Sequence, residues 1–210
     1  MTEQRAVAPL TSFVGGDAGS WAVQRINHIT GPGLPHVPLV AVIEGPGTRL
    51  SPNAVWVLRG AVRREEYATG AEHEALARRQ QPLGRPTAIH AALIPITKSQ
   101  AWWQLSQDKR RAIFEETSHH IAIGMQYLPA IARRLHHGRH LGEPFDFLTW
   151  FEFEPEHEAA FEELVGRLRA SEEWSYVVRE VDIRLKRPPP IRSDSAVANR
   201  QSTPIDVAQA

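Results

Sequence analysis

The chain has 210 residues, a formal net charge of zero and an apolar content of 42%. This length suits one large domain or two small ones, and the balanced charge favours neither nucleic acid nor an acidic membrane surface as a partner. Because cysteine is absent, disulfides, thiolate catalysis, zinc–cysteine sites and iron–sulfur ligation are excluded.

The two ends of the chain differ from its middle. Met1–Ala8 lack the apolar core of a secretion signal, and no apolar run is long enough for a membrane span. We therefore expect a cytoplasmic protein with no membrane segment. Residues 1–10 are predicted to be a flexible N-terminus. Residues 188–210, rich in Pro and Ser, are predicted to be a disordered tail, which leaves a domain over 11–187.

The first half of this domain consists of strand patterns, turn signals and one helix. Trp21–Thr30 alternates apolar and polar side chains, as a half-buried strand does, and Gly15-Gly16-Asp17 is predicted to be a turn. Pro95 favours a sheet edge or a strand end. Three further strands and a helix are predicted at Leu39–Ile43, Ala54–Val62, Thr87–Ile96 and, for the helix, Glu65–Gln80.

The second half begins with a longer helical region. Helical spacing starts at Ser99, and a long helix is predicted from Gln107 through about Tyr127 and on to His137. Proline should kink it near residue 129, and a glycine at 138 can end it. The later elements are predicted to be a strand at Phe145–Phe153, a helix at 156–170 and a strand at Trp174–Leu185.

Strands and helices interleave in both halves. This order favours an α+β fold of two ferredoxin-like units, roughly residues 11–98 and 99–187, whose sheets pack together or close into a barrel. A doubly wound nucleotide fold is disfavoured, because Gly15–Gly19 lacks both the dinucleotide fingerprint and the phosphate-loop Gly-Lys-Ser/Thr. The aromatic strand 145–153 is too apolar for water on both faces, so we expect a stable homodimer.

Five of the ten histidines lie within residues 119–140. On the predicted helix His120 shares a face with Ile123 and points inward, whereas His119 shares a face with Glu115 and points outward. An inward imidazole is either a core histidine with a hydrogen-bond partner or a ligand, and the pattern leaves both interpretations open.

Two other histidine arrangements are weaker. His136, His137 and His140 invite a metal interpretation. Gly138 ends the predicted helix between them, which favours a solvated helix end instead. Ser118 lies next to a histidine in the sequence, but adjacency does not establish a catalytic triad in space.

Several segments, taken in chain order, resemble the chlorite dismutase family, and in particular its short, dimeric branch. They are Ile94–Trp103 (IPITKSQAWW), Ser118-His119-His120, Tyr127–Arg133 (YLPAIAR), Gly142–Phe153 (GEPFDFLTWFEF) and Glu172-Glu173-Trp174. The resemblance covers about residues 10–187. It implies a dimeric α+β barrel of two ferredoxin-like halves, in agreement with the independent strand pattern.

The resemblance also assigns roles to individual residues. His120 matches the proximal ligand of haem b, and Glu173 matches the carboxylate that accepts a hydrogen bond from it. Lys98 matches a lysine of the same network, and Arg133 matches a mobile distal arginine. The remaining residues matched to the haem pocket are Trp102, Trp103 and Leu128.

The implied reaction is decomposition of chlorite to chloride and dioxygen through a ferryl intermediate and transient hypochlorite. Arg133 would attract the chlorite anion and hold the hypochlorite for recombination. Three rival functions stay open: another haem protein of the superfamily (a coproheme decarboxylase or a dye-type peroxidase), a non-haem dimeric ligand-binding module, and a purely structural dimer. The decarboxylases that resemble this fold lack the arginine found here at position 133.

Overall fold

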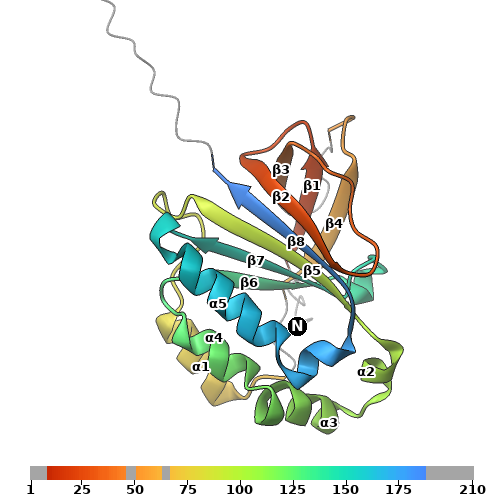
Figure 1. Cartoon of the computed structure of the whole chain (residues 1–210), viewed down its shortest axis with the longest axis vertical. Helices are drawn as coiled ribbons and strands as arrows, with labels where there is room; N and C mark the ends of the chain where they lie inside the picture. The colour runs from red at the N-terminus through yellow and green to blue at the C-terminus, as the bar shows by residue number, and fades with distance from the viewer. Residues whose placement is uncertain (1–8, 46–50, 63–66, 188–210) are drawn as a thin grey trace, which may run out of the picture.

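The computed structural model describes residues 9–45, 51–62 and 67–187. Within these ranges eight strands, each antiparallel to its neighbours, close into a barrel in the order β1-β3-β2-β8-β5-β7-β6-β4 (Figure 1). The strands are β1 (Leu10–Gly16), β2 (Trp21–Thr30), β3 (Leu39–Glu44), β4 (Trp56–Ala61), β5 (His90–Lys98), β6 (Ala132–His137), β7 (Phe147–Phe153) and β8 (Val177–Lys186). The α-helices are α1 (Gly70–Arg79), α2 (Gln100–Gln104), α3 (Gln107–Arg111), α4 (His120–Gln126) and α5 (Glu158–Arg169). A π-helix, η1 (Ala112–Thr117), and the 3-10 helices η2 (Arg139–Leu141), η3 (Pro155–His157) and η4 (Glu172–Tyr176) complete the chain.

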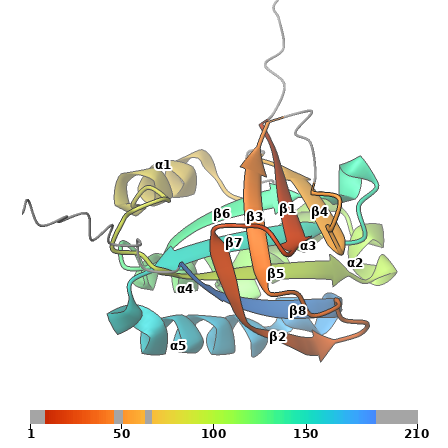
Figure 2. The same ribbon diagram turned by 90° about the horizontal axis from the view of Figure 1, so that it is seen from above.

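Strands β5 and β7 are buried on both faces. Leu93 and Trp150 point into a core inside the barrel, whereas their neighbours Ile94 and Phe151 point into a second core beneath the helices. Successive side chains of a strand point to opposite faces, so a strand covered on both sides is apolar throughout. Helices α4 and α5 lie along the outer face of these strands and supply the other half of the second core (Figures 1 and 2).

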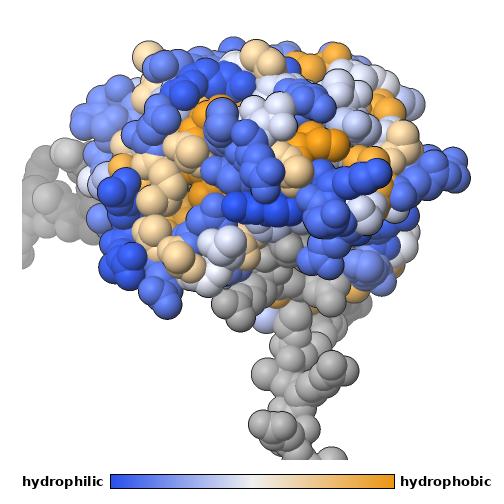
Figure 3. Space-filling model, turned by 90° about the horizontal axis from the view of Figure 1, so that it is seen from below, coloured by the Kyte–Doolittle hydropathy of each residue, from blue (hydrophilic) through white to orange (hydrophobic). Residues whose placement is uncertain are grey.

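Because β7 is buried on both faces, its apolar side chains are no argument for a homodimer. The aromatic strand does not need a second copy of the chain, because the barrel interior covers one face and α5 covers the other. Seen from below, the surface is mainly hydrophilic, with hydrophobic groups between the hydrophilic ones (Figure 3).

Most predicted strands are confirmed to within a few residues, with two local corrections. Gly15 and Gly16 end β1 and do not form the turn, which begins after them. Gly15 is required there because the Trp56 ring packs on it: a Cβ would lie 2.1 Å from Trp56 Cε2. Pro95 lies inside a central strand, and the paired positions of β5 with β8 pass from Leu93 directly to Ile96.

Two predicted helices outside the barrel are also confirmed. The predicted helix Glu65–Gln80 is α1, which begins at Gly70 behind the N-cap Thr69; its first predicted residues, 65 and 66, lie outside the described ranges. Helix 156–170 is η3 followed by α5. The predicted tail 188–210 also lies outside the described residues.

The long helix from Gln107 to His137 is the main error of the sequence prediction. The chain forms α3, then η1, breaks at His119, and resumes as α4 only to Gln126. Residues 132–137 form β6, which pairs with β7 along its whole length. Arg, Leu and Ala favour helices, but strand pairing overrides that weak local preference. Pro129 disfavours helical geometry at Leu128, the residue that follows the C-cap of α4.

The histidines on β6 are neither a metal cluster nor a solvated helix end. His136 and His137 are buried, and among the described residues no group of three or more His, Asp or Glu side chains could hold a metal ion. The Nδ1 atom of His136 lies 3.2 Å from the Leu148 carbonyl oxygen, and its ring meets Phe13 edge-on. Burial lowers the pKa of His136 from 6.5 to about 4, only partly offset by the Leu148 carbonyl.

We predict a pH dependence of stability that depends on His136. Between pH 6.5 and 4 the unfolded imidazole binds a proton and the folded one does not, so the free energy of unfolding falls as pH falls. The difference amounts to roughly 3 kcal/mol below pH 4. His136→Asn keeps an N–H near Nδ1 and should remove this part of the slope in denaturant unfolding measured from pH 8 to 4.

The matched control is His140→Asn, since His140 is exposed. This variant should keep the wild-type slope. If the free energy of unfolding changes equally with pH in the two variants, His136 is not the titrating group.

Candidate functional site

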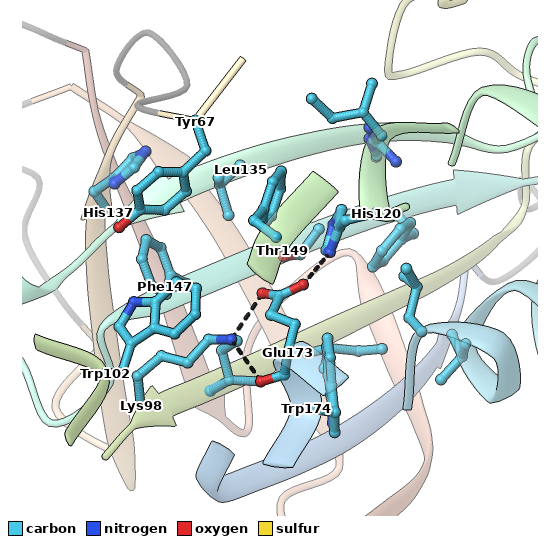
Figure 4. A pocket seen from close by; sticks show the side chains of 18 residues that line it. Tyr67, Lys98, Trp102, His120, Leu135, His137, Phe147, Thr149, Glu173 and Trp174 are labelled. Carbon is cyan, nitrogen blue, oxygen red and sulfur yellow. Dashed lines mark hydrogen bonds and ion pairs between the residues drawn. The ribbon is translucent and has the colours of Figure 1, made fainter. Parts of the chain in front are cut away.

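A pocket opens between the outer face of β5, β6 and β7 and the surrounding helices (Figure 4). It contains about 1000 Å³ of space not occupied by atoms, its open mouth included. Its walls are mostly apolar, so a bound molecule there is shielded from water. The strands contribute Ile94, Ile96, Leu135, Phe147 and Phe151 to the lining.

Three polar side chains that line this pocket contact one another (Figure 4). His120 Nδ1 lies 2.6 Å from Glu173 Oε2, and Lys98 Nζ lies 2.7 Å from Glu173 Oε1. Lys98 Nζ also donates to the backbone carbonyl of Glu173. The side chains of Lys98 and Glu173 are 1% and 4% exposed, whereas that of His120 is 22% exposed toward the pocket.

The charges of this group follow from their mutual contacts. Burial alone would raise the pKa of Glu173, but the charges and hydrogen bonds of His120 and Lys98 lower it to about 2. Burial lowers the pKa of Lys98, and Glu173 and Asp146 offset part of that effect. Glu173 is therefore an ionised acceptor, so Nδ1 of His120 must carry the proton they share. The other imidazole nitrogen, Nε2, is left to bind a ligand.

A backbone break places His120 at the start of α4. His119 has φ of 53°, in the left-handed region, and its own side chain does not cap the helix. Glu115, one turn back in η1, accepts hydrogen bonds from the backbone N–H groups of Ile121 and Ala122. These first-turn donors have no acceptor within the helix, so Glu115 allows α4 to start again after the break. His119 is exposed, as predicted, although the continuous helix used to predict it does not exist.

Lys98 is fixed by the end of β5 and by aromatic rings. Its backbone N–H donates to Asp146, and its ammonium lies 4.4 Å from the centre of the Trp102 ring. Trp102 is fully buried and lines the pocket. Trp103 lies behind the lining: its indole N–H donates to Asp146 and its ring stacks on Phe147.

Arg133 lines the pocket from β6, as part of a strand rather than a helix. Its guanidinium packs against Gly124 of α4, where a Cβ would lie 2.0 Å from Arg133 Nη1. Leu135 and His137, at spacings of two along β6, line the same pocket.

Sequence reasoning missed part of the lining. Leu128 follows α4 and does not line the pocket, whereas Leu135 does. The alternation Arg133, Leu135, His137 would have shown this had the segment been recognised as a strand. The other lining residues not anticipated include Tyr67, Phe114 and Thr149.

The donor set and the walls of the pocket fit a haem. One imidazole nitrogen is available, its partner nitrogen is bound to a carboxylate, and the surrounding side chains are mainly apolar. A bare metal ion would need several protein ligands. The iron of a haem is already bound by the macrocycle and needs only one ligand from the chain.

Comparison with known proteins identifies the class of protein that this fold and site define. The family model for chlorite dismutase matches residues 48–186, and the chain belongs to that family. A search of curated proteins gives no match. In the described residues no helix is both long and apolar enough to cross a membrane.

Solved structures give the same family. The dimeric chlorite dismutase from Nitrobacter winogradskyi is 54% identical, with a TM-score of 0.78 over 84% of this chain and 99% of that one. The chlorite dismutase from Candidatus Nitrospira defluvii, in complex with imidazole, is 20% identical, with a TM-score of 0.62 over 86% and 91% of the two chains. A variant of that enzyme with cyanide is 18% identical, with a TM-score of 0.64 over 90% and 96%. The latter two comparisons support the fold alone.

We predict that Glu173→Gln lowers the free energy of unfolding by about 3–5 kcal/mol, because it leaves the buried Lys98 ammonium without its counter-charge. The double variant Glu173→Gln with Lys98→Met should recover most of this loss. Urea unfolding of the two single variants and the double variant measures the coupling.

The control is Glu172→Gln, the exposed neighbour in the same 3-10 helix. It should change stability by less than about 0.5 kcal/mol. A Glu173→Gln protein as stable as this control would contradict the pairing.

Proposed function

We propose that this protein is a haem b enzyme that decomposes chlorite to chloride and dioxygen. The observation that carries the proposal is the pocket-facing His120, whose Nδ1 is held by the buried carboxylate of Glu173. The 54% identity to a dimeric chlorite dismutase supports the same function.

Each polar residue has a role in holding the cofactor. His120 would bind the haem iron through Nε2, and Glu173 would keep the ring oriented and make that nitrogen more basic. Lys98 keeps Glu173 ionised, since its ammonium stabilises the buried negative charge. A bound haem would supply redox chemistry at its iron. The apolar walls of the pocket would limit the access of water to the bound group.

Arg133 is the residue proposed to act on the substrate. Its positive charge would attract chlorite into an otherwise apolar pocket. Chlorite, ClO₂⁻, loses one oxygen atom to become hypochlorite, and the second oxygen must join the first to leave chloride and dioxygen. The planar guanidinium can hold the hypochlorite by two parallel hydrogen bonds until that happens.

The proposal includes a homodimer of barrels, each made of two ferredoxin-like halves. In each half the strand order by position is fourth, first, third, second: β4-β1-β3-β2 in the first and β8-β5-β7-β6 in the second. With this division β5 begins the second half, whereas the boundary expected from the sequence placed it at the end of the first. That repeat supports two related units. Support for the dimer is the similarity to the dimeric enzyme from Nitrobacter winogradskyi.

The first test is haem binding and oxygen evolution. Protein loaded with haem b should show a Soret band and release dioxygen when chlorite is added, measured with an oxygen electrode. His120→Ala should lose stable haem binding because the iron loses its protein ligand. His119→Ala, its exposed neighbour, should keep a nearly unchanged Soret band.

The possible failures point to different functions. A Soret band without oxygen evolution would indicate a coproheme decarboxylase or a peroxidase-like relative. No haem binding at all would indicate a ligand-binding or structural dimer. Equal loss of haem in the two histidine variants would show that His120 is not the ligand.

The second test concerns Arg133. Arg133→Ala should still bind haem and react with chlorite, but more hypochlorite should escape and inactivate the enzyme sooner. A charge-assisted hydrogen bond is worth about 1.5–3 kcal/mol, which corresponds to about 10- to 150-fold in retention. Arg133→Lys should recover only part of this. Oxygen yield per chlorite and hypochlorite caught by a chlorination trap should be measured together.

Arg134→Ala provides the matched control, because Arg134 is the next residue of β6, lies on the opposite face of the strand and pairs with Glu44. It should leave oxygen yield and trapped hypochlorite at wild-type values. An Arg133→Ala enzyme that behaves the same way would exclude the retention role.

A further inference from the structure

Ser118 makes a long-range contact with the segment that carries Glu173. Its hydroxyl oxygen accepts the backbone N–H of Glu173 at 2.9 Å, and both residues are buried, at 4% and 3% exposure. Glu173 lies in the first turn of η4, where backbone N–H groups have no acceptor within the helix. The cap for this N–H therefore comes from a segment 55 residues away.

The same short segment also holds the side chain of Glu173. His120, two residues after Ser118, hydrogen-bonds Oε2 of the carboxylate at 2.6 Å. Glu173 is thus fixed at its backbone by one residue and at its carboxylate by another. Neither contact can change much without straining the other, because only His119 separates the two residues.

A continuous helix could not make both contacts. Residues i and i+2 of an α-helix do not face each other or a common partner. The left-handed conformation of His119, with φ of 53°, turns the chain so that Ser118 and His120 both reach Glu173. Glu115 supplies the acceptors for α4, so the Ser118 hydroxyl is not needed to cap the helix that follows it.

We propose that Ser118 is a positioning residue for the His120–Glu173 pair, an inference that rests on the proposed function. By holding the Glu173 backbone, Ser118 sets the distance and direction of the carboxylate relative to His120 Nδ1. It thereby keeps the proton on Nδ1 and Nε2 directed into the pocket. Ser118 would act through these two residues and need not touch the cofactor or the substrate.

The experiment compares Ser118→Ala with Ser175→Ala. Ser175 lies in the same 3-10 helix as Glu173, is exposed, and donates only to the Glu172 carbonyl. Two quantities are measured for each full-length protein. The first is the ¹⁵N chemical shift of the His120 ring nitrogens without haem, which reports the tautomer. The second is the rate at which the haem-loaded protein loses haem to excess apomyoglobin.

Ser118→Ala should reduce the share of the Nδ1–H tautomer and speed haem loss by up to about tenfold, the lower end of the effects of outer contacts at metal sites. It should also raise the ferric/ferrous midpoint potential, because a less basic ligand stabilises the ferric state less. Ser175→Ala should match the wild type in every measurement.

The outcomes separate this inference from the proposed function. Ser118→Ala and Ser175→Ala spectra that both match the wild type would overturn the inference, whatever the haem results. If the wild type binds no haem, the proposed function fails and the tautomer measurement alone decides the role of Ser118. If Ser118→Ala does not fold, Ser118→Cys, which keeps the volume but is a weak acceptor, undergoes the same measurements and decides the question.

Discussion

The buried carboxylate of Glu173 is the constraint on which the site depends. An ionised group that is 3% exposed is tolerated only if charges and hydrogen bonds replace water around it. Lys98 comes from the end of β5, His120 from α4 and Glu173 itself from η4. These elements meet only when the barrel has closed and the helices have packed on it. The chemistry of the pocket is therefore a product of the complete fold, and no single segment contains it.

The barrel provides the rigid wall opposite these groups. Because β5 and β7 are buried on both faces, a side chain cannot shift on one face without disturbing the core on the other. Arg133 is attached to this wall through β6, which pairs with β7 along its whole length. Gly124 leaves room for its guanidinium beside α4, since any Cβ at this position would collide with it. A charged side chain is thus held in a mostly apolar pocket by a strand on one side and a glycine on the other.

Local pattern predicted the elements whose periodicity is strong and unbroken. The aromatic content of Phe147–Phe153 and the helical spacing of Phe161 and Leu164 identified β7 and α5 without outside help. The pairing of Lys98 with Glu173 could not be found in this way, because the residues are 75 positions apart in the chain. Their proposed roles came from the family resemblance alone. Leu135 was missed for a different reason: its segment was assigned the helical period instead of that of a strand.

The break at His119 explains both the failed helix and the geometry of the site. A non-glycine residue in the left-handed region costs of order 1–3 kcal/mol and persists only where its surroundings over-determine it. Here the surroundings are partly long-range and partly local: Ser118 and His120 contact the distant Glu173, and the nearby Glu115 caps α4. No local propensity in the sequence predicts this break, because the two contacts with Glu173 that help to stabilise it join segments more than 50 residues apart. The point at which local prediction of the helix fails is also the point at which the chain is bent to present the histidine, as expected where function rather than propensity sets the backbone.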